Sequence, residues 1–280
     1  MQERVFPLFW DSIERLGRYV VQQFLYTGRV LALVYLTFRT AAVDQAQGFR
    51  TILSVISAQI YFTGWQALPL ISMLALASGS LVIMQSSFQL GLFGNHELIG
   101  QLLVIVIVRE LAPLLTALLV VARSGTAVAS EVGNMKANRE IEALEVMGIN
   151  PLSYIVFPRL MGGMISVVCL AFYFVLIALL GGFLVTKFTH DLPFSFYTES
   201  LAAAVAQEDI FLFLLKNTFG GAIIFTVCCY QGMMVKQSPH EVPQVTTKAV
   251  VDSIIYVTVF NLGVSLWFYI SQLSRMGGVL

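Results

Sequence analysis

The sequence predicts an all-α integral membrane protein with an N-terminal interfacial helix and five transmembrane helices. Of its 280 residues, 58% are hydrophobic and only 11% are charged, whereas a soluble domain carries about 25% charged residues. The mean hydropathy is +0.82, and five segments reach the length of about 20 apolar residues that a spanning helix needs. Because so few charges cannot cover a water-exposed surface, a soluble enzyme is not expected.

The charge balance and the cysteines argue against several other classes of protein. Basic and acidic residues number 16 each, so no basic excess points to nucleic-acid binding. Cys169, Cys228 and Cys229 lie in apolar runs, where we expect small buried hydrophobic side chains rather than a disulfide framework. The chain also has no histidine and cysteine spacing typical of a metal site.

Residues 1–50 are predicted to form an interfacial helix and a polar connector. Between residues 13 and 38 the pattern is helical, with Arg15, Arg18 and Arg29 near one face and apolar side chains elsewhere. A helix with a basic and an apolar stripe typically lies in the membrane interface. The alternative is an ordinary amphipathic helix packed against the rest of the protein.

Residues 51–280 are predicted to form the spanning domain. If the N-terminus is cytoplasmic, five spans place the C-terminus outside. Nearly all basic residues outside the spans then lie on the inner side, and only Lys187 and Arg275 lie outside, as the positive-inside rule requires. The acidic outer loop 186–209 agrees with this orientation. The predicted spans cover residues 64–90, 98–121, 160–185, 210–235 and 249–273.

No motif for nucleotide binding or hydrolysis occurs in the chain. There is no G-x-x-x-x-G-K loop, so ATP is not bound through a P-loop. His96-Glu97 begins like a zinc-protease motif, but the fifth position is Gly100. We therefore expect a non-catalytic protein without a cofactor or metal. If transport is its task, the energy must come from a partner or an ion gradient.

Small residues after the second span predict a close contact between helices. Gly125, Ala129 and Gly133 recur at steps of four, and small residues at this spacing let two helices approach closely.

A short charged helix is predicted at residues 138–148. Ile141, Leu144 and Met147 recur at steps of three among acidic residues, and Gly148 ends the helix. Such a helix between two spans has the form of a plug for a groove on another protein. The alternative is a solvated loop helix.

The same segment carries a resemblance to a known family. The run ARSGTAVASEVGNMKANREIEALEVMGINPLSYIVFPR, preceded by VRELAPLLTALLV, closely resembles the signature of the MlaE/YrbE family. These proteins are permease subunits of bacterial ABC systems that move phospholipids between the inner and outer membranes and so contribute to outer-membrane lipid asymmetry. The resemblance extends over roughly residues 50–269 and includes LLKNTFGGAIIFTVCCYQG and TTKAVV. Where the family usually has a Gly-rich turn after the fourth span, this chain has residues 236–243.

The resemblance implies an assembly in the bacterial inner membrane. It implies a homodimer that holds phospholipid at its interface, a cytoplasmic ATPase that binds ATP and Mg, a periplasmic ring of MCE-domain lipid-binding subunits and a small STAS-domain subunit. The charged helix would be the coupling helix in a groove of the ATPase. Its implied contacts are Arg139, Glu140, Glu142, Leu144 and Glu145.

Arg109, Glu110 and Lys216 fall inside apolar segments. Each ionised group near the bilayer centre costs about 2.5–3.5 kcal/mol on insertion scales. Arg109 and Glu110 are sequence neighbours and do not face each other, so we predict an ion pair between Glu110 and Lys216. The pair is either structural or part of a polar patch that receives a lipid head group. The resemblance favours the patch, because the matching positions in the family lie by the lipid pocket.

The first span offers a candidate wall for lipid tails. Such an apolar stripe is more often plain helix packing. The resemblance to a family whose homodimer holds lipid between the two first spans makes it the best candidate for the cavity lining. In the fifth span, a position that is acidic in some members of the family is Asn261 here. The candidate substrate-binding residues are Leu74, Leu81, Met84, Gln85, Phe88, Arg109, Glu110, Lys216 and Asn261.

A secondary transporter or channel that uses Glu110 and Lys216 is the alternative function. Broken spans and buried charges are typical of that class. The chain shows no internal repeat, and five spans make inverted symmetry awkward. The sequence leaves the direction of transport and the head-group preference open.

Overall fold

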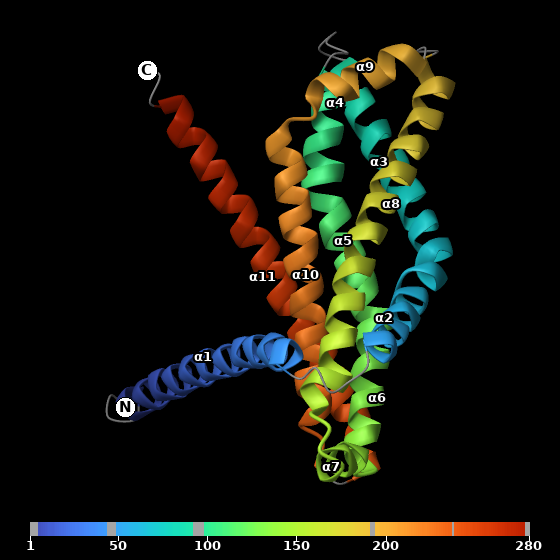
Figure 1. Ribbon diagram of the computed structural model, residues 1–280. Helices are drawn as coiled ribbons and strands as arrows, with labels where there is room; N and C mark the ends of the chain where they lie inside the picture. The colour runs from blue at the N-terminus through green and yellow to red at the C-terminus, as the bar shows by residue number, and fades with distance from the viewer. Residues whose placement is uncertain (1–4, 44–48, 92–97, 191–193, 237, 278–280) are drawn as a thin grey trace.

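The computed structural model describes residues 5–43, 49–91, 98–190, 194–236 and 238–277, and every regular element in them is helical. Five segments are long and apolar enough to cross a membrane. These observations confirm the predicted fold class. The spanning helices stand side by side in one bundle, with α7 at one end and α9 at the other (Figure 1). The spanning segments are Ile52–Ser86, Gly100–Ala137, Leu152–Val185, Gln207–Met233 and Pro239–Arg275.

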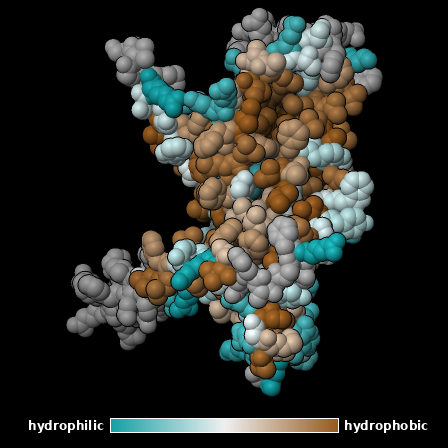
Figure 2. Space-filling view, viewed as in Figure 1, coloured by the Kyte–Doolittle hydropathy of each residue, from teal (hydrophilic) through white to brown (hydrophobic). Residues whose placement is uncertain are grey.

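Hydrophobic side chains cover most of the visible face of the bundle, and hydrophilic ones gather towards its two ends (Figure 2). The second span has 38 residues. At about 1.5 Å per residue it is longer than the hydrocarbon core of about 30 Å. Part of the helical bundle therefore projects beyond the membrane.

The first span is broken near its middle. It consists of α2 (Phe49–Thr63) and α3 (Leu68–Gly91), joined through the 3-10 turn η1 (Trp65–Ala67). Pro69 lies in the first turn of α3, where a residue without an N–H is tolerated. The first span was predicted to begin at residue 64. It begins earlier, because α2 is also apolar and belongs to the same span.

The second span is one long helix with two π-helical stretches, and the short helix α7 follows it. Its parts are α4 (Leu98–Leu103), η2 (Val104–Leu111), α5 (Ala112–Val120), η3 (Val121–Gly125) and α6 (Thr126–Ala137), and α7 covers Glu140–Val146.

The third to fifth spans complete the bundle. The upper part of α11 leans away from α10 (Figure 1). The elements are η4 (Leu152–Val156), α8 (Phe157–His190), α9 (Phe194–Ala204), α10 (Gln207–Met233), η5 (Pro239–Glu241) and α11 (Val242–Gly277).

The connection predicted at residues 186–209 lies between the third and fourth spans, as expected, and it is largely helical. The end of α8, the helix α9 and the start of α10 occupy most of it. Asp209 belongs to α10, where its Oδ2 accepts a hydrogen bond of 3.0 Å from the backbone N–H of Ala206. It caps the helix and is buried.

Small residues set the closest helix contacts, as predicted after the second span. A Cβ added to Gly125 would lie 3.0 Å from Cys228 Sγ, and one added to Gly133 would lie 3.1 Å from Val235 Cγ2. On the facing helix α10, a Cβ added to Gly232 would lie 2.9 Å from the carbonyl oxygen of Ala129. The contact joins α6 to the end of α10 and to the residues that follow it.

The N-terminal helix α1 (Val5–Val43) crosses the bundle instead of running parallel to the spans, nearer to α7 than to α9 (Figure 1). Tyr26 holds it there, since its ring lies 5.3 Å from Tyr230 and 5.8 Å from Tyr256. This orientation agrees with an interfacial helix, and the helix is longer at both ends than predicted. The side chains of Arg15 and Arg18 lie outside the described residues.

The cysteines correct one expectation. Cys228 and Cys229 are buried on α10, as predicted, but Cys169 is exposed on α8. All three are free thiols.

Candidate functional site

The predicted ion pair between Glu110 and Lys216 is present between η2 and α10. Lys216 Nζ lies 3.3 Å from both carboxylate oxygens of Glu110. Ser265 of α11 completes the contact, because Lys216 Nζ donates to its Oγ (2.7 Å) and that Oγ donates to Glu110 Oε1 (2.9 Å). Three spans therefore meet at one charged group.

A proline in the second span creates a further acceptor for Lys216. Pro113 has no N–H and cannot bond to the carbonyl of Arg109 one turn before it. Lys216 Nζ donates to this carbonyl oxygen at 2.6 Å. The ammonium group thus supplies a donor where the N–H of Pro113 is missing, in an apolar setting.

Arg109 has a partner that the sequence did not indicate. Its Nε lies 2.5 Å from Asp209 Oδ1, and its guanidinium lies 5.1 Å from the centre of the Phe268 ring. The sequence places Asp209 in the predicted outer loop. What marks this acidic residue is its burial at the start of α10, which is seen only in the structure. Arg109, Glu110, Asp209 and Lys216, here called the polar cluster, carry two charges of each sign.

The polar cluster opens to the outside of the chain through Glu110. The side chain of Lys216 is 2% exposed, whereas that of Glu110 is 39% exposed. Asn261 lies one turn before Ser265 and is buried, but its Nδ2 donates to the Val257 carbonyl of its own helix (3.0 Å). Glu110 is therefore the member of the cluster best placed to meet a ligand.

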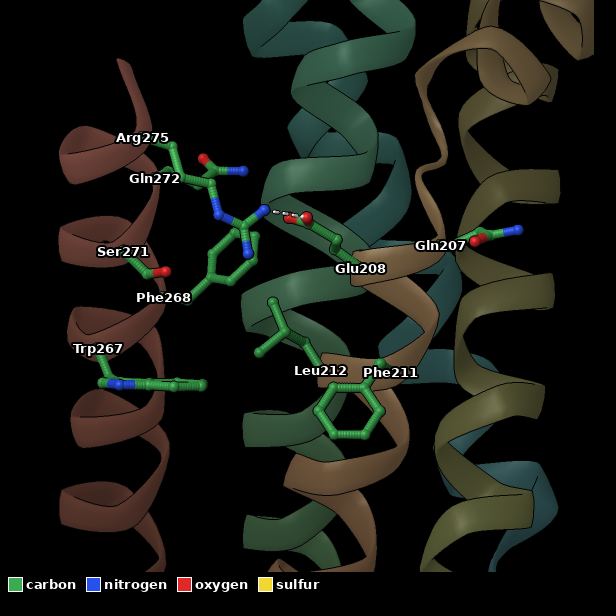
Figure 3. Close-up of a pocket in the computed structure, with 9 residues that line it drawn as sticks. All are labelled: Gln207, Glu208, Phe211, Leu212, Trp267, Phe268, Ser271, Gln272 and Arg275. Atoms are coloured by element: carbon green, nitrogen blue, oxygen red, sulfur yellow. Dashed lines mark hydrogen bonds and ion pairs between the residues drawn. The ribbon is translucent and has the colours of Figure 1, made fainter. Parts of the chain in front are cut away.

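A cavity of about 340 Å³ lies beside the cluster, between α10 and α11. The aromatic rings of Phe211 and Trp267 project into it from the two helices (Figure 3). At its rim, Arg275 Nη1 donates to Glu208 Oε1 at 2.6 Å. Phe268 joins the two features, because it lines the cavity and lies under Arg109. None of these lining residues had been predicted.

A larger apolar cavity of about 740 Å³ lies on the other side of α10, towards α8 and α9. Its walls include Val108, Phe172 and Phe213. Asp209 is its charged lining residue, and that carboxylate is already paired with Arg109. This cavity offers an apolar surface with no free charge on its described lining.

The predicted residues of the first span lie apart from the polar cluster. Leu74, Leu81, Met84 and Gln85 are exposed on α3, which packs mainly on α8, while the cluster faces α11. The side chain of Phe88 lies outside the described residues. Within one chain the structure therefore does not bring the stripe of α3 and the polar cluster together.

The short charged helix predicted at 138–148 is present as α7, with tight turns at both ends. Arg139 before it has a left-handed backbone (φ 61°), and Gly148 after it has φ 76°, as expected for a helix C-cap. Ile141 is buried and anchors the helix. Lys136 Nζ donates to Glu142 Oε1 at 3.2 Å, so Glu142 is engaged within the chain.

The outermost surface of α7 is partly apolar. Val146 is 89% exposed and Met147 is 65% exposed, next to the exposed Glu140 and Glu145. Leu144 is half-buried. Val146 had not been predicted as a contact, because the pattern of steps of three does not include it.

Comparisons with known proteins agree with this architecture. A family model described as Permease MlaE matches residues 56–267. A probable ABC transporter permease protein of Rickettsia conorii is 31% identical over 232 residues, which are 83% of this chain and 90% of that protein. The intermembrane phospholipid transport system permease protein MlaE of Haemophilus influenzae is 28% identical over 248 residues, or 88% of this chain and 93% of that protein. The matched region contains the polar cluster and α7, and the chain belongs to the MlaE permease family.

Proposed function

We propose that this chain is the transmembrane permease subunit of an ABC transporter that moves phospholipids between the inner and outer membranes of a bacterium. The observation that carries the proposal is the family match, which runs through all five spans, the polar cluster and α7. The relative from Haemophilus influenzae is named for this transport. The chain acts as a transport component, and a separate ATPase binds and hydrolyses ATP.

The polar cluster and the adjacent cavity suit the two parts of a phospholipid. The half-exposed Glu110 and the neighbouring Lys216 present charges of both signs to a head group. The aromatic cavity between α10 and α11 offers an apolar wall to an acyl chain. Because the cluster is neutral as a whole, it does not need a ligand of one sign to balance it.

A second copy of the chain would complete the site. The exposed face of α3 carries Leu74, Leu81 and Met84, and α11 exposes Val259 and Leu266. A two-fold dimer places the same surface on both copies. In such a homodimer α3 of one copy can approach α11 of the other, which would bring the predicted apolar stripe to the polar cluster with the lipid between them.

The ATPase would dock on α7 in the cytoplasm. Exposed acidic side chains and the apolar tip of Val146 and Met147 form its contact surface, with Arg139 and Leu144 beside them. This placement puts the N-terminus in the cytoplasm and the C-terminus in the periplasm. The periplasmic MCE-domain ring would then lie at the α9 end, and the STAS-domain subunit would lie on the cytoplasmic side.

Force from the ATPase can reach the spans through a short path. α7 begins three residues after α6 ends, and α6 packs closely on α10, which carries Lys216 and Asp209. An ATPase that contacts α7 differently in its two nucleotide states shifts the balance between two arrangements of the spans. The relative position of Glu110 and Lys216 would change with it.

The comparisons do not favour the secondary transporter.

Reversing the charge of α7 should detach the ATPase. We expect Glu140→Lys with Glu145→Lys to lower co-purification of the ATPase at least about tenfold, because two acidic side chains of the proposed contact surface become basic. A tenfold loss corresponds to about 1.4 kcal/mol of binding free energy. Glu142 is left intact because it pairs with Lys136. The measurement is the ratio of ATPase to permease in the purified complex.

Glu199→Lys, which reverses another exposed acidic residue on α9 at the other end of the bundle, is the control and should leave the ratio unchanged. ATP-dependent lipid transfer should fall with the ratio. A doubly reversed variant that keeps its ATPase and transfers lipid at the wild-type rate would contradict the proposed role of α7.

A further inference from the structure

A polar cavity of about 520 Å³ lies where α1 crosses α11, remote from the transport cluster. Its lining includes Tyr26 and Arg29 from α1, and Lys248 and Asp252 from α11. Asp252 precedes Ser265 by 13 positions, which is about 20 Å along a helix at 1.5 Å per residue. The cavity is therefore separate from the site that we propose for transported lipid.

The floor of this cavity is a preset hydrogen-bond network. Gln231 is buried, and its Nε2 donates to Asp252 Oδ2 at 2.7 Å and to the Tyr26 hydroxyl at 2.9 Å. Gln23 Nε2 donates to the Tyr256 hydroxyl at 2.8 Å. Burial, together with the nearby Asp252 carboxylate, raises the pKa of Tyr26 well above its usual value. Tyr26 is thus a neutral group, and Asp252 supplies the negative charge of the floor.

Two cations, Arg29 and Lys248, line the mouth of the cavity. Arg29 and Lys248 are exposed, and neither forms an ion pair with any residue in the described ranges. Arginine and lysine are the side chains that bind phosphate, arginine through a planar fork and lysine as a point charge. A carboxylate beside them can accept hydrogen bonds from an ammonium group.

An apolar surface continues from the cavity along α11. Val251 and Ile255 are exposed four positions apart, so they lie on the same face of the helix. Leu25 of the cavity lining is exposed as well. The arrangement of two cations, one carboxylate and an apolar track matches a molecule with a phosphate, an amine and a hydrocarbon tail.

We propose that this cavity binds the head group of an amine-bearing phospholipid from the leaflet on the α7 side of the membrane. Arg29 and Lys248 hold the phosphate, Asp252 accepts the ammonium group, and the acyl chains follow the exposed face of α11. The bound lipid ties α1 to α11 at the membrane surface. It is a resident lipid that positions the interfacial helix, and it is not cargo.

Native mass spectrometry of the delipidated full-length protein tests the site. The protein is titrated with phosphatidylethanolamine, with phosphatidylglycerol, which lacks the amine, and with inorganic phosphate. We expect Arg29→Gln with Lys248→Gln to raise the apparent Kd for one phosphatidylethanolamine per chain by about tenfold or more. The charge-matched control, Arg39→Gln with Lys236→Gln, removes two exposed cations outside the cavity and should leave that Kd unchanged.

Three further comparisons make the test specific. Asp252→Asn should abolish the preference for phosphatidylethanolamine over phosphatidylglycerol, and the swap Arg29→Lys with Lys248→Arg should keep binding. Equal affinity of wild type and the Arg29/Lys248 double variant for phosphatidylethanolamine would overturn the proposal. So would a dependence on these two cations seen only with inorganic phosphate. Glu110→Gln with Lys216→Met should retain this lipid, which separates the outcome from that of the transport proposal.

Discussion

Lys216→Met should abolish lipid transport and destabilise the protein. Lys216 holds the Glu110 carboxylate, the Arg109 carbonyl and Ser265 together. Removing one partner of a buried ion pair typically costs 3–5 kcal/mol. We expect a loss near the lower end, about 3 kcal/mol, because Glu110 is partly exposed and can reach polar surroundings. Lipid transfer by the assembled transporter should fall at least about tenfold, since the proposed head-group site loses the cation that pairs with Glu110.

A double variant separates the structural role of this pair from its role in transport. Glu110→Gln with Lys216→Met leaves no unpaired charge, so the amount of folded protein in the membrane should recover. Transfer should stay low if the two charges bind the lipid. Protein abundance and lipid transfer are measured on the same membranes. Wild-type transfer at wild-type abundance in Lys216→Met would show that the pair has no role in transport.

Gly79→Ala should prevent accumulation of the folded protein. A Cβ at Gly79 would overlap the backbone carbonyl of Ala178, and no side-chain rotation can relieve a clash with backbone. The helices α3 and α8 would have to separate along the contact that also includes Gly181, where a Cβ would lie 3.0 Å from the Leu76 carbonyl oxygen. Overpacking typically costs 1–3 kcal/mol, and a backbone clash lies at or above the upper end of this range.

The matched control is Gly263→Ala on α11. A Cβ there meets nothing within 4 Å, and alanine favours a helix over glycine by about 0.5–1 kcal/mol. Gly263→Ala should therefore match or slightly exceed the wild type in thermal stability in detergent. If Gly79→Ala unfolds at the same temperature as Gly263→Ala, the close approach of α3 and α8 is not a constraint on this fold.

The sequence indicated features that depend on local pattern or on the energetics of a single group. The apolar composition and the length of the segments predicted the five spans. Gly148 predicted the end of α7, because a glycine suits the left-handed turn after a helix. The high cost of an isolated charge in hydrocarbon predicted a partner for Glu110, and Lys216 was the economical choice.

The pairing of Arg109 could not be predicted in the same way. Asp209 lies in a stretch with the composition of an acidic loop, and its burial depends on where α10 begins and on how η2 packs against it. The contact of Lys216 with the Arg109 carbonyl was equally hidden. It requires the carbonyl left free by Pro113 to face another span at the right height, which no local pattern encodes.

What the sequence by itself determined is therefore the membrane class, the number of spans, the short charged helix after the second span and the need to pair Glu110 with Lys216. These follow from the transfer free energy of each segment and from local backbone preferences. Only the tertiary structure decided which groups meet: Arg109 with Asp209, Ser265 with Glu110, and α1 with α11 around a polar cavity. Helices of similar hydropathy can pack in several rotations and heights, and the close fit of glycine against backbone selects among them.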